Sequence, residues 1–373
     1  MNPLVRLLTE AGLTGRGGAD FPTAVKVEMA QNHSADVIVN ACDGELGARK
    51  DSWVIAHHLD EVLSGARLVT RGRITLAAHQ RSATLTTLTR YGVDSLEVPN
   101  RYVASEESAL VSLAHGGPAR PLTRRKPVTA GARSHSGRRL PPTLVLNAET
   151  VWRIAQIADH GPRWFRSFGT PTEPGPRLLT TITSSSLSRV HPAEAGLTVP
   201  EILALADTTL ESVSAIWFGG LGGGFLTATD APTATWSRAG LRHFGIQPGS
   251  GTVRVIGAHD SPWSIVTAAL TYAAGQSAQQ CGPCMFGVPA LAADTTRLLT
   301  DPDPAILQRL TRRLDELTGR GACSYPDGVA GFLKTALNVF GPPCPAIARH
   351  RQTTPPPESI QYNSTPKKEE RSA

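Results

Sequence analysis

The sequence predicts a three-part protein: an α/β domain, a small β-grasp-like module and an all-α four-helix bundle. Three observations support this prediction. Strands and helices alternate at first, as at 36–40 and 52–70, which is typical of an α/β layer. Short strands and a glycine run take over from residue 177, and the pattern is helical from residue 261. We expect boundaries at 1–170, 171–248 and 249–349, with a disordered tail at 350–373.

The first part continues with a predicted strand at 73–78 and a helix at about 80–91. Ser105 has the character of a helix N-cap, and the helix after it should run to about His115. Apolar order returns at 143–146 and in the helix that follows.

The middle part is expected to contain strands at 178–182 and 215–218. Thr198 and Glu201 have the spacing of a capping box, which opens a short helix. A tight run of glycines follows the second strand at 219–224.

The last part is expected to hold helices that begin at Ser261–Pro262 and at Asp303–Pro304. The second of these places four apolar side chains on one face: Ile306, Leu310, Leu314 and Leu317. A third helix covers 329–340, and the segment after Cys284 supplies a fourth. Four such helices predict a bundle.

Composition restricts the kind of partner. The chain has 373 residues, a net charge of +6 and only 5% aromatic residues, which argues against a surface for stacking nucleic-acid bases. Much of the excess charge lies in one Pro/Gly-rich loop: Arg120, Arg124, Arg125, Lys126, Arg133, Arg138 and Arg139. Such a loop is either a solvated connection or a docking patch for an acidic redox partner.

The N-terminal residues lack the apolar core of a signal peptide, and no run of about 18 apolar residues occurs. We therefore expect a cytoplasmic protein without membrane insertion, which reaches a membrane only through a partner. Five cysteines in such a protein favour a metal or redox role over a disulfide framework.

The C-terminal cysteines suit a metal centre. Cys281 and Cys284 form a C-x-x-C turn, and Cys323 lies where a bundle returns the chain to the same end. Thiolates are soft ligands that select iron–sulfur clusters or zinc. A buried thiol pair or a disulfide is the alternative. Cys344 is the remaining candidate for a fourth ligand.

An N-terminal glycine loop suits a phosphate. Gly15, Gly17 and Gly18 let backbone amides approach an anion, and Arg16 and Lys26 add charge. A simple turn-rich loop is the alternative.

Polar side chains follow the strand at 36–40. Asn40, Asp43 and Glu45 stand after the strand end, which is the usual place for ligand contacts in an open α/β sheet. A solvated polar turn is the alternative.

Taken together, these segments resemble the NADH-binding flavoprotein subunit of respiratory complex I and related subunits of hydrogenases and formate dehydrogenases. The resemblance runs in order along nearly the whole chain. Five segments carry it: 12–23 (GLTGRGGADFPT), 40–47 (NACDGELG), 102–110 (YVASEESAL), 147–150 (NAET) and 276–284 (QSAQQCGPC).

The resemblance implies that NADH gives a hydride to FMN and that single electrons pass to a [4Fe–4S] cluster and a partner. It also implies that the β-grasp-like module is of the SLBB (soluble-ligand-binding) type. The acceptor would be a ferredoxin-like or membrane redox protein. By matched position, the cofactor-binding residues would be Gly15, Arg16, Gly17, Gly18, Phe21, Lys26, Asn40, Asp43, Glu45, Tyr102, Glu106, Glu107, Asn147 and Thr150. Among these, Glu45 and Glu107 would lie near the nucleotide, and Phe21 would stack on it.

The chain departs from the family at functional positions. Ala278 stands where the family has its first cluster cysteine, which leaves Cys281, Cys284 and Cys323 as matched ligands. A three-cysteine site would take Cys344 or an outside ligand, or hold a [3Fe–4S] cluster.

Other departures affect the flavin loop and the nucleotide. Cys42 replaces an acid, Asp20 replaces a glycine, and Met29 and Thr129 occupy positions where the family has aromatic residues. Two alternatives therefore remain: a divergent iron–sulfur relay or assembly subunit without NADH binding, and a zinc-stabilised scaffold that uses the same cysteines.

Overall fold

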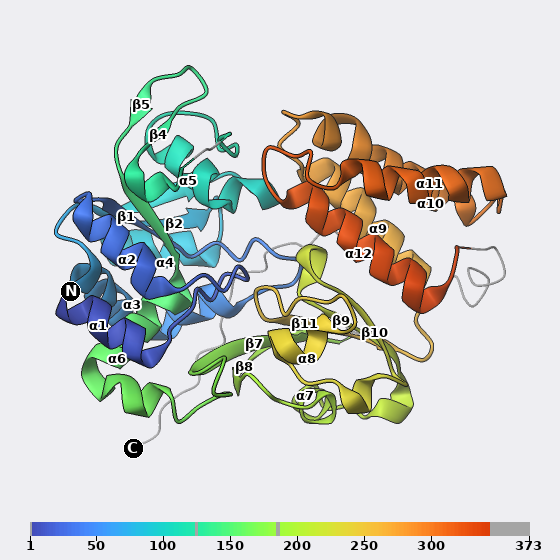
Figure 1. The fold of residues 1–373 in the computed structure, drawn as a ribbon, viewed down its shortest axis with the longest axis horizontal. Helices are drawn as coiled ribbons and strands as arrows, with labels where there is room; N and C mark the ends of the chain where they lie inside the picture. Colours follow the sequence, from blue (N-terminus) through green and yellow to red (C-terminus); the bar gives the residue numbers. More distant parts are fainter. Residues whose placement is uncertain (1, 124–125, 184–186, 344–373) are drawn as a thin grey trace.

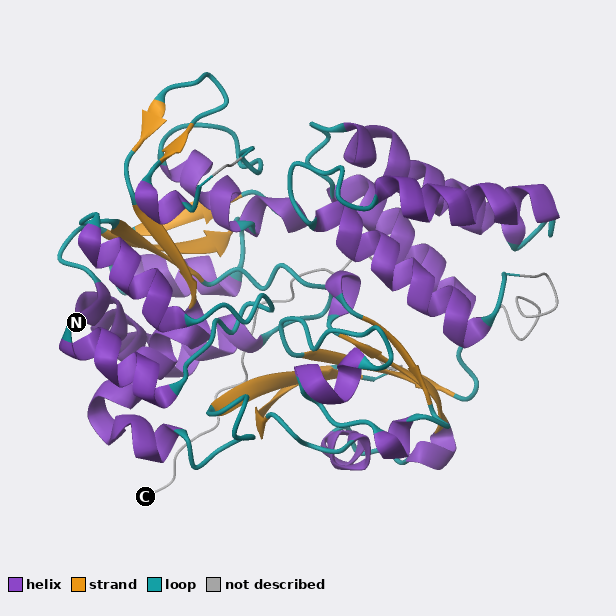
Figure 2. Cartoon of the chain, viewed as in Figure 1, coloured by secondary structure: helices purple, strands orange, loops and turns teal. Residues whose placement is uncertain are grey.

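The computed structural model describes residues 2–123, 126–183 and 187–343. The expected tail at 350–373 lies outside these ranges. Figure 1 shows an N-terminal α/β part, a middle part built on a second sheet, and a C-terminal group of helices beside both. Figure 2 shows that strands occur in the first two parts and that the last part is helical. No helix among the described residues has the length and apolar character needed to cross a bilayer.

The N-terminal sheet has four parallel strands in the order β3-β2-β1-β6. They are β1 (Asp36–Asn40), β2 (Ile74–His79), β3 (Ser95–Val98) and β6 (Thr143–Asn147). Its helices are α1 (Pro3–Ala11), α2 (Thr23–Asn32), α3 (Lys50–Val69), α4 (Ala83–Arg90), α5 (Glu107–Ala114) and α6 (Ala148–Phe165). A short hairpin joins β4 (Ala132–Arg133) to β5 (Arg139–Leu140).

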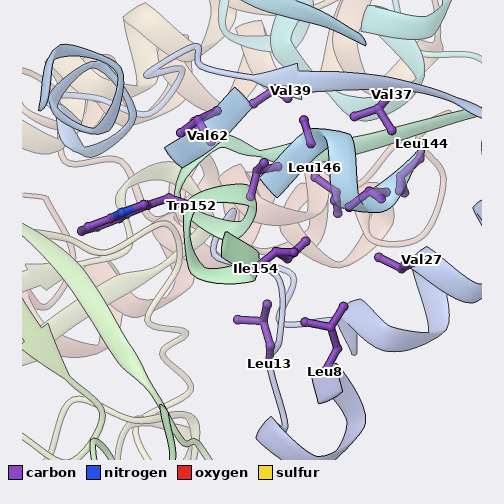
Figure 3. Packing of buried hydrophobic residues seen from close by; sticks show 14 of the residues in the cluster. Leu8, Leu13, Val27, Val37, Val39, Val62, Leu144, Leu146, Trp152 and Ile154 are labelled. Carbon is purple, nitrogen blue, oxygen red and sulfur yellow. The ribbon is translucent and has the colours of Figure 1, made fainter. Parts of the chain in front are cut away.

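Successive residues of β1 belong to two different hydrophobic cores, because successive side chains on a strand point to opposite faces of the sheet. Val37 and Val39 pack with α1, α2, α3 and α6, as Figure 3 shows, while Ile38 belongs to a second core that includes α5. The strand expected at 36–40 has those bounds. The predicted helices and strands of this part are otherwise found within a few residues.

The predicted N-cap at Ser105 is wrong. Ser105 ends a short 3-10 turn, and its hydroxyl donates to the carbonyl of Tyr102 at 3.0 Å. Glu106 caps α5 instead, because its carboxylate accepts from the amides of Ser108 at 2.8 Å and Ala109 at 3.0 Å.

The middle sheet has the order β10-β9-β11-β7-β8. Its strands are β7 (Pro176–Ile182), β8 (Ser188–Glu194), β9 (Val213–Phe218), β10 (Gly224–Thr227) and β11 (Thr252–Gly257), with α7 (Val199–Leu205) and α8 (Arg238–Arg242) packed nearby. Only the β11–β7 pair is parallel. The capping box of Thr198 and Glu201 is confirmed. Because β11 pairs with β7 and β9, this sheet extends past residue 248, where the sequence placed the end of the module.

Four helices form the C-terminal part: α9 (Pro262–Gln276), α10 (Val288–Leu298), α11 (Pro304–Leu317) and α12 (Tyr325–Phe340). The helices α9 and α11 each pack against α10 and α12. The expected helix starts are confirmed, and Asp303 caps α11 by accepting from the amide of Ala305 at 2.8 Å. The four predicted apolar side chains of α11 are all buried.

The contact between α3 and α6 depends on Gly65. A Cβ atom at Gly65 would overlap with the carbonyl oxygen of Val151 on α6. We expect Gly65→Ala to lower the free energy of unfolding by about 1–3 kcal/mol, since the helices must separate. Gly331→Ala on α12, where a Cβ meets nothing within 4 Å, should instead raise it by about 0.5–1 kcal/mol. Denaturant unfolding of both variants checks this pair, and equal effects would contradict the close approach.

Candidate functional site

The candidate site lies where the strand order of the N-terminal sheet reverses. Strand β2 lies on one side of β1 and β6 on the other, and such a switch point is the usual ligand crevice of an open α/β sheet. The register pairs Asn40 with Asn147, the last residues of β1 and β6. Both predicted side chains therefore stand at the same sheet edge.

A cavity of about 580 Å³ opens at this edge, within the range of cofactor sites. It brings together nearly all the residues predicted for cofactor binding: Gly15, Gly17, Gly18, Phe21, Lys26, Asn40, Asp43, Glu45, Tyr102, Glu106, Glu107, Asn147 and Thr150. The middle part lines it with Gly219, Leu221 and Gly249, and the C-terminal part with Cys323 and Tyr325. All three parts of the fold thus meet at one cavity.

Arg16 is the exception, and the predicted role of its charge does not fit the structure. Its backbone amide donates to Thr150 Oγ1 at 2.8 Å, but its guanidinium donates to the carbonyl of Pro174 at 3.0 Å. Burial and nearby Arg177 lower the pKa of Arg16 to about 9. The side chain therefore joins the glycine loop to the chain before β7 and does not line the cavity.

The start of α2 suits an anion. No side chain caps this helix, and its first turn lines the cavity. The hydroxyl of Thr23 is fully buried, lines the same cavity and has no hydrogen-bond partner among the described residues. Buried hydroxyls are normally paired, so this orphaned group fits a ligand oxygen. Lys26, one turn further on, forms an ion pair of 2.8 Å with Glu107.

The polar turn after β1 is organised by hydrogen bonds. Asn40 donates to the carbonyl of Ser105 at 3.0 Å and accepts from the amide of Cys42 at 3.0 Å. The carboxylate of Asp43 accepts from the amides of Asp51 at 2.9 Å and Ser52 at 3.0 Å, and so caps α3. The turn is a fixed wall of the cavity.

Glu45 links the first part to the middle module. Its carboxylate accepts from the amides of Leu46 at 2.9 Å and Leu221 at 3.0 Å, and from the hydroxyl of Tyr102 at 2.7 Å. A Cβ at Gly220, where φ is +61°, would overlap with this carboxylate. Burial raises the pKa of Glu45 despite these three donors. Leu221 and Gly220 are therefore site residues that the sequence revealed only as a glycine run.

Glu45→Gln should make stability less dependent on pH. Since the folded pKa of Glu45 is raised, the folded state holds its proton more strongly, and the wild type loses stability as pH rises from about 4.5 through the folded pKa. Glutamine preserves the shape but does not titrate. We expect the melting temperature of the variant minus that of the wild type to increase as pH rises, and to become constant above the folded pKa of Glu45. A decrease of this quantity with rising pH would contradict the raised pKa.

A buried charge cluster forms part of the cavity wall, since Lys50 and Asp51 both line the cavity, and it was missed by the sequence reasoning. Lys50 is 1% exposed and contacts Asp51 at 3.0 Å, Glu149 at 3.3 Å and the Asn147 side-chain oxygen at 2.8 Å. The two carboxylates raise the pKa of Lys50 against the effect of burial, and burial raises the pKa of Asp51 to about 6. The cluster fixes Asn147 at the cavity wall. The adjacent charges Lys50 and Asp51, so soon after the polar turn, were the signal available in the sequence.

The cysteines gather at one end of the C-terminal helices. Cys284 is buried, and its pKa is raised to about 12 by burial, with Cys281 and Cys323 close enough to add to the effect. The amide of Ala278 donates to the Cys284 thiol. Three soft donors fit an iron–sulfur or zinc centre, one thiol short of four. Cys344, the predicted fourth ligand, lies outside the described residues.

These thiols are not arranged as a ready-made metal site. Across 2–123, 126–183 and 187–343, no three His, Cys, Asp or Glu side chains meet in such a geometry. Cys42 is separate from them, because it is buried in the N-terminal core with its sulfur 3.6 Å from the carbonyl oxygen of Ala77.

A second cavity of about 430 Å³ shares Phe21, Lys26 and Glu107 with the first. Its other lining residues include Val25, Met29, Lys126, Pro127 and Thr129. Phe21 is the one aromatic residue among its lining residues, and it is 46% exposed. The hydroxyl of Thr129 donates to the sulfur of Met29 at 2.7 Å. The two positions where the family has aromatic residues are therefore in contact with each other in this chain.

Comparison with known proteins agrees with both halves of the site. Residues 8–156 match the family described as "Nuo51 FMN-binding domain", and residues 264–345 match the "NADH-ubiquinone oxidoreductase-F iron-sulfur binding region". The fold and site thus define a protein with an FMN-binding domain and an iron–sulfur-binding region. The chain belongs to the family of NADH-binding flavoprotein subunits, as a divergent member.

Individual relatives show the extent of the divergence. The chain is 27% identical over 232 residues to the NAD-reducing hydrogenase HoxS subunit alpha of Cupriavidus necator, covering 54% of this chain and 38% of that protein. It is 24% identical to the mitochondrial NADH dehydrogenase [ubiquinone] flavoprotein 1 of Dictyostelium discoideum, and the match covers 91% of this chain and 77% of that protein. Its fold matches a chain of an NAD+-reducing [NiFe]-hydrogenase with a TM-score of 0.77 and 26% identity, covering 90% of this chain and 61% of that one.

Proposed function

We propose that this protein passes electrons from NADH through FMN to an iron–sulfur cluster and on to a redox partner. One observation carries the proposal: Cys323 lines the same cavity as the glycine loop and the ends of β1 and β6. A flavin and a cluster held by these residues would be neighbours. FMN, when bound, supplies the conversion of a two-electron hydride donor into single electrons.

The FMN phosphate would bind at the start of α2. The amides of Gly17 and Gly18, the orphaned hydroxyl of Thr23 and the charge of Lys26 favour an anion there. Beside the glycine loop, Asn147 is held in place by Lys50, and Thr150 by the Arg16 amide.

The nucleotide would occupy the second cavity, which opens beside the first. Phe21 offers a stacking face, and Glu107, fixed by Lys26, offers an acceptor for ribose hydroxyls. Glu106 caps α5 and lines the first cavity. Loss of a second stacking ring at Met29 or Thr129 would cost on the order of 1 kcal/mol of nucleotide affinity.

The cluster would be held by Cys281, Cys284 and Cys323. With Cys344 as fourth ligand it would be a [4Fe–4S] cluster, and with three thiolates a [3Fe–4S] cluster. The helix N-terminus after Cys323 favours its negative charge.

We further interpret the middle sheet as an SLBB-type β-grasp module and α9–α12 as the iron–sulfur-binding four-helix bundle. In this proposal residues 1–170 form the flavin domain. The protein is cytoplasmic, and its electron acceptor is a ferredoxin-like protein or a membrane redox protein. The relatives support such an assembly, since their names describe an NADH dehydrogenase flavoprotein and one subunit of a hydrogenase.

A second candidate is an iron–sulfur relay that does not bind NADH. The contact between Met29 and Thr129 favours it, because it replaces the aromatic walls expected around the adenine. Anaerobic purification with iron, sulfide, zinc and flavin measured on one sample, followed by titration with NADH, separates the candidates. Flavin bleaching by NADH supports the first. Iron without flavin supports the relay, and zinc without iron would overturn both.

A further inference from the structure

The cysteine turn carries an exposed apolar pair. Met285 is 49% exposed and Phe286 is 70% exposed, and they follow Cys284 directly. Few other large apolar side chains in the described ranges are this exposed, and of these Phe21 and Val25 line the second cavity. An exposed aromatic residue beside a redox centre is the kind of anchor found at protein interfaces.

The exposure of this pair is built into the fold. Cys284 and Val288, on either side of it, are buried, and the amide of Met285 donates to the carbonyl of Cys281 at 2.9 Å. Gly287 packs so closely on Leu317 of α11 that a Cβ there would overlap with it. The turn is therefore anchored at both ends and presents the two side chains outward in a fixed position.

Two exposed arginines lie near this turn. The Gln280 side chain donates to the carbonyl of Pro121 at 2.7 Å, which brings the exposed Arg120 close to the cysteine turn. Leu317, which packs on Gly287 of the turn, also accepts from the amide of the exposed Arg320 at 3.3 Å. Neither arginine forms an ion pair within the part of the chain that the structure describes.

Two of the nearby acidic residues have basic partners of their own, because Asp315 pairs with Lys334 at 2.8 Å and Glu316 with Arg312 at 3.5 Å. Asp327 accepts from the amide of Gly319 at 2.8 Å and keeps its negative charge. The turn is thus an apolar centre near two arginines whose positive charge Asp327 offsets only in part.

We propose that Met285 and Phe286, with Arg120 and Arg320 at the rim, form the docking surface for an acidic iron–sulfur protein that takes electrons from the cluster. This proposal rests on the proposed function, since it needs a cluster at Cys281 and Cys284. In each transfer one electron leaves the reduced cluster and reduces the oxidised centre of the partner. One NADH, which yields NAD+, a proton and two electrons, therefore reduces two partner molecules.

The test uses the holoprotein and an oxidised acidic plant-type [2Fe–2S] ferredoxin, with ferricyanide as a small acceptor. The double variant Met285→Ser/Phe286→Ser should raise the KM for ferredoxin roughly tenfold or more, because it removes the apolar anchor. Its iron and flavin contents and its rate with ferricyanide should stay at wild-type levels. Leu68→Ser, which removes an exposed apolar side chain of α3, is the matched control and should change neither rate.

The charged rim is tested separately. Arg120→Ser/Arg320→Ser should slow ferredoxin reduction at low salt and weaken its dependence on ionic strength, because steering by charge is screened by salt. An unchanged KM in the apolar double variant would overturn the proposal. A change in sedimentation on the same variant would also overturn it, since the pair would then join two copies of the chain.

Chemical reduction distinguishes failure of the docking surface from failure of the proposed function. If dithionite-reduced protein reduces ferricyanide but not ferredoxin, the partner class is wrong. In a second outcome, NADH reduces neither acceptor while dithionite-reduced wild type still reduces ferredoxin with a lower KM than the Met285→Ser/Phe286→Ser variant. In that case the docking surface stands and NADH is not the donor. If the purified protein holds no iron, both proposals fail.

Discussion

Replacing Lys50 with methionine should lower the free energy of unfolding by about 3–5 kcal/mol, because buried Asp51 loses its counter-ion and buried Glu149 keeps only Arg153, at 3.5 Å. Lys50 is 1% exposed and contacts Asp51 and Glu149, whose side chains are 6% and 2% exposed. Because methionine fills a similar volume, the loss of unfolding free energy would come from the missing charge and not from a cavity. Asn147 also loses its contact with Lys50, and flavin affinity should therefore fall with stability.

A matched control separates burial from charge. Lys334→Met breaks an ion pair of 2.8 Å with Asp315, whose side chain is 72% exposed, and we expect a change of about 1 kcal/mol or less. Denaturant unfolding of both variants at one pH checks the pair. If Lys50→Met cost no more than Lys334→Met, the buried cluster would contribute nothing to stability.

Replacing Cys281 with serine should remove most of the iron and acid-labile sulfide, because a serine oxygen is a harder and poorer ligand for iron than a thiolate. The thiol is only partly buried, so the fold should tolerate the change. Iron and sulfide analysis after anaerobic purification, together with the visible spectrum, measures the effect.

Cys42→Ser is the control for this experiment. Cys42 lines the same cavity as Cys323 but packs in the N-terminal core with its sulfur 3.6 Å from the carbonyl oxygen of Ala77, so its replacement should leave the iron content unchanged. Wild-type iron in the Cys281→Ser variant would exclude the proposed cluster, and stoichiometric zinc in the wild type would identify a scaffold in its place.

The helices and strands were largely predictable because their signals are local. The strand at 36–40 is a short apolar run before a polar turn, and α11 shows apolar residues at helical spacing after Asp303–Pro304. The cap of α5 was not predictable in this way. Ser105 is a residue type favoured at the N-cap, but its hydroxyl donates to the carbonyl of Tyr102 in the preceding turn, and Glu106 caps the helix in its place.

The end of the middle sheet also required the tertiary structure. Strand β11 follows a glycine-rich loop and directly precedes the C-terminal helices, so the sequence favoured a boundary at residue 248. Its partners β7 and β9 are distant in sequence, and only their pairing places β11 in the sheet.

Local patterns in the chain were enough to identify residues that could serve a flavin and a cluster: glycines at 15–18, polar side chains after strands, and a C-x-x-C turn, because these residue types carry the chemistry wherever they lie. How these residues meet depends on the folded chain. Folding turns the charge of Arg16 away from the cavity, pairs buried Lys50 with Asn147 and places Cys323 at the cavity wall. Such outcomes depend on contacts between residues far apart in the chain, and no local pattern encodes them.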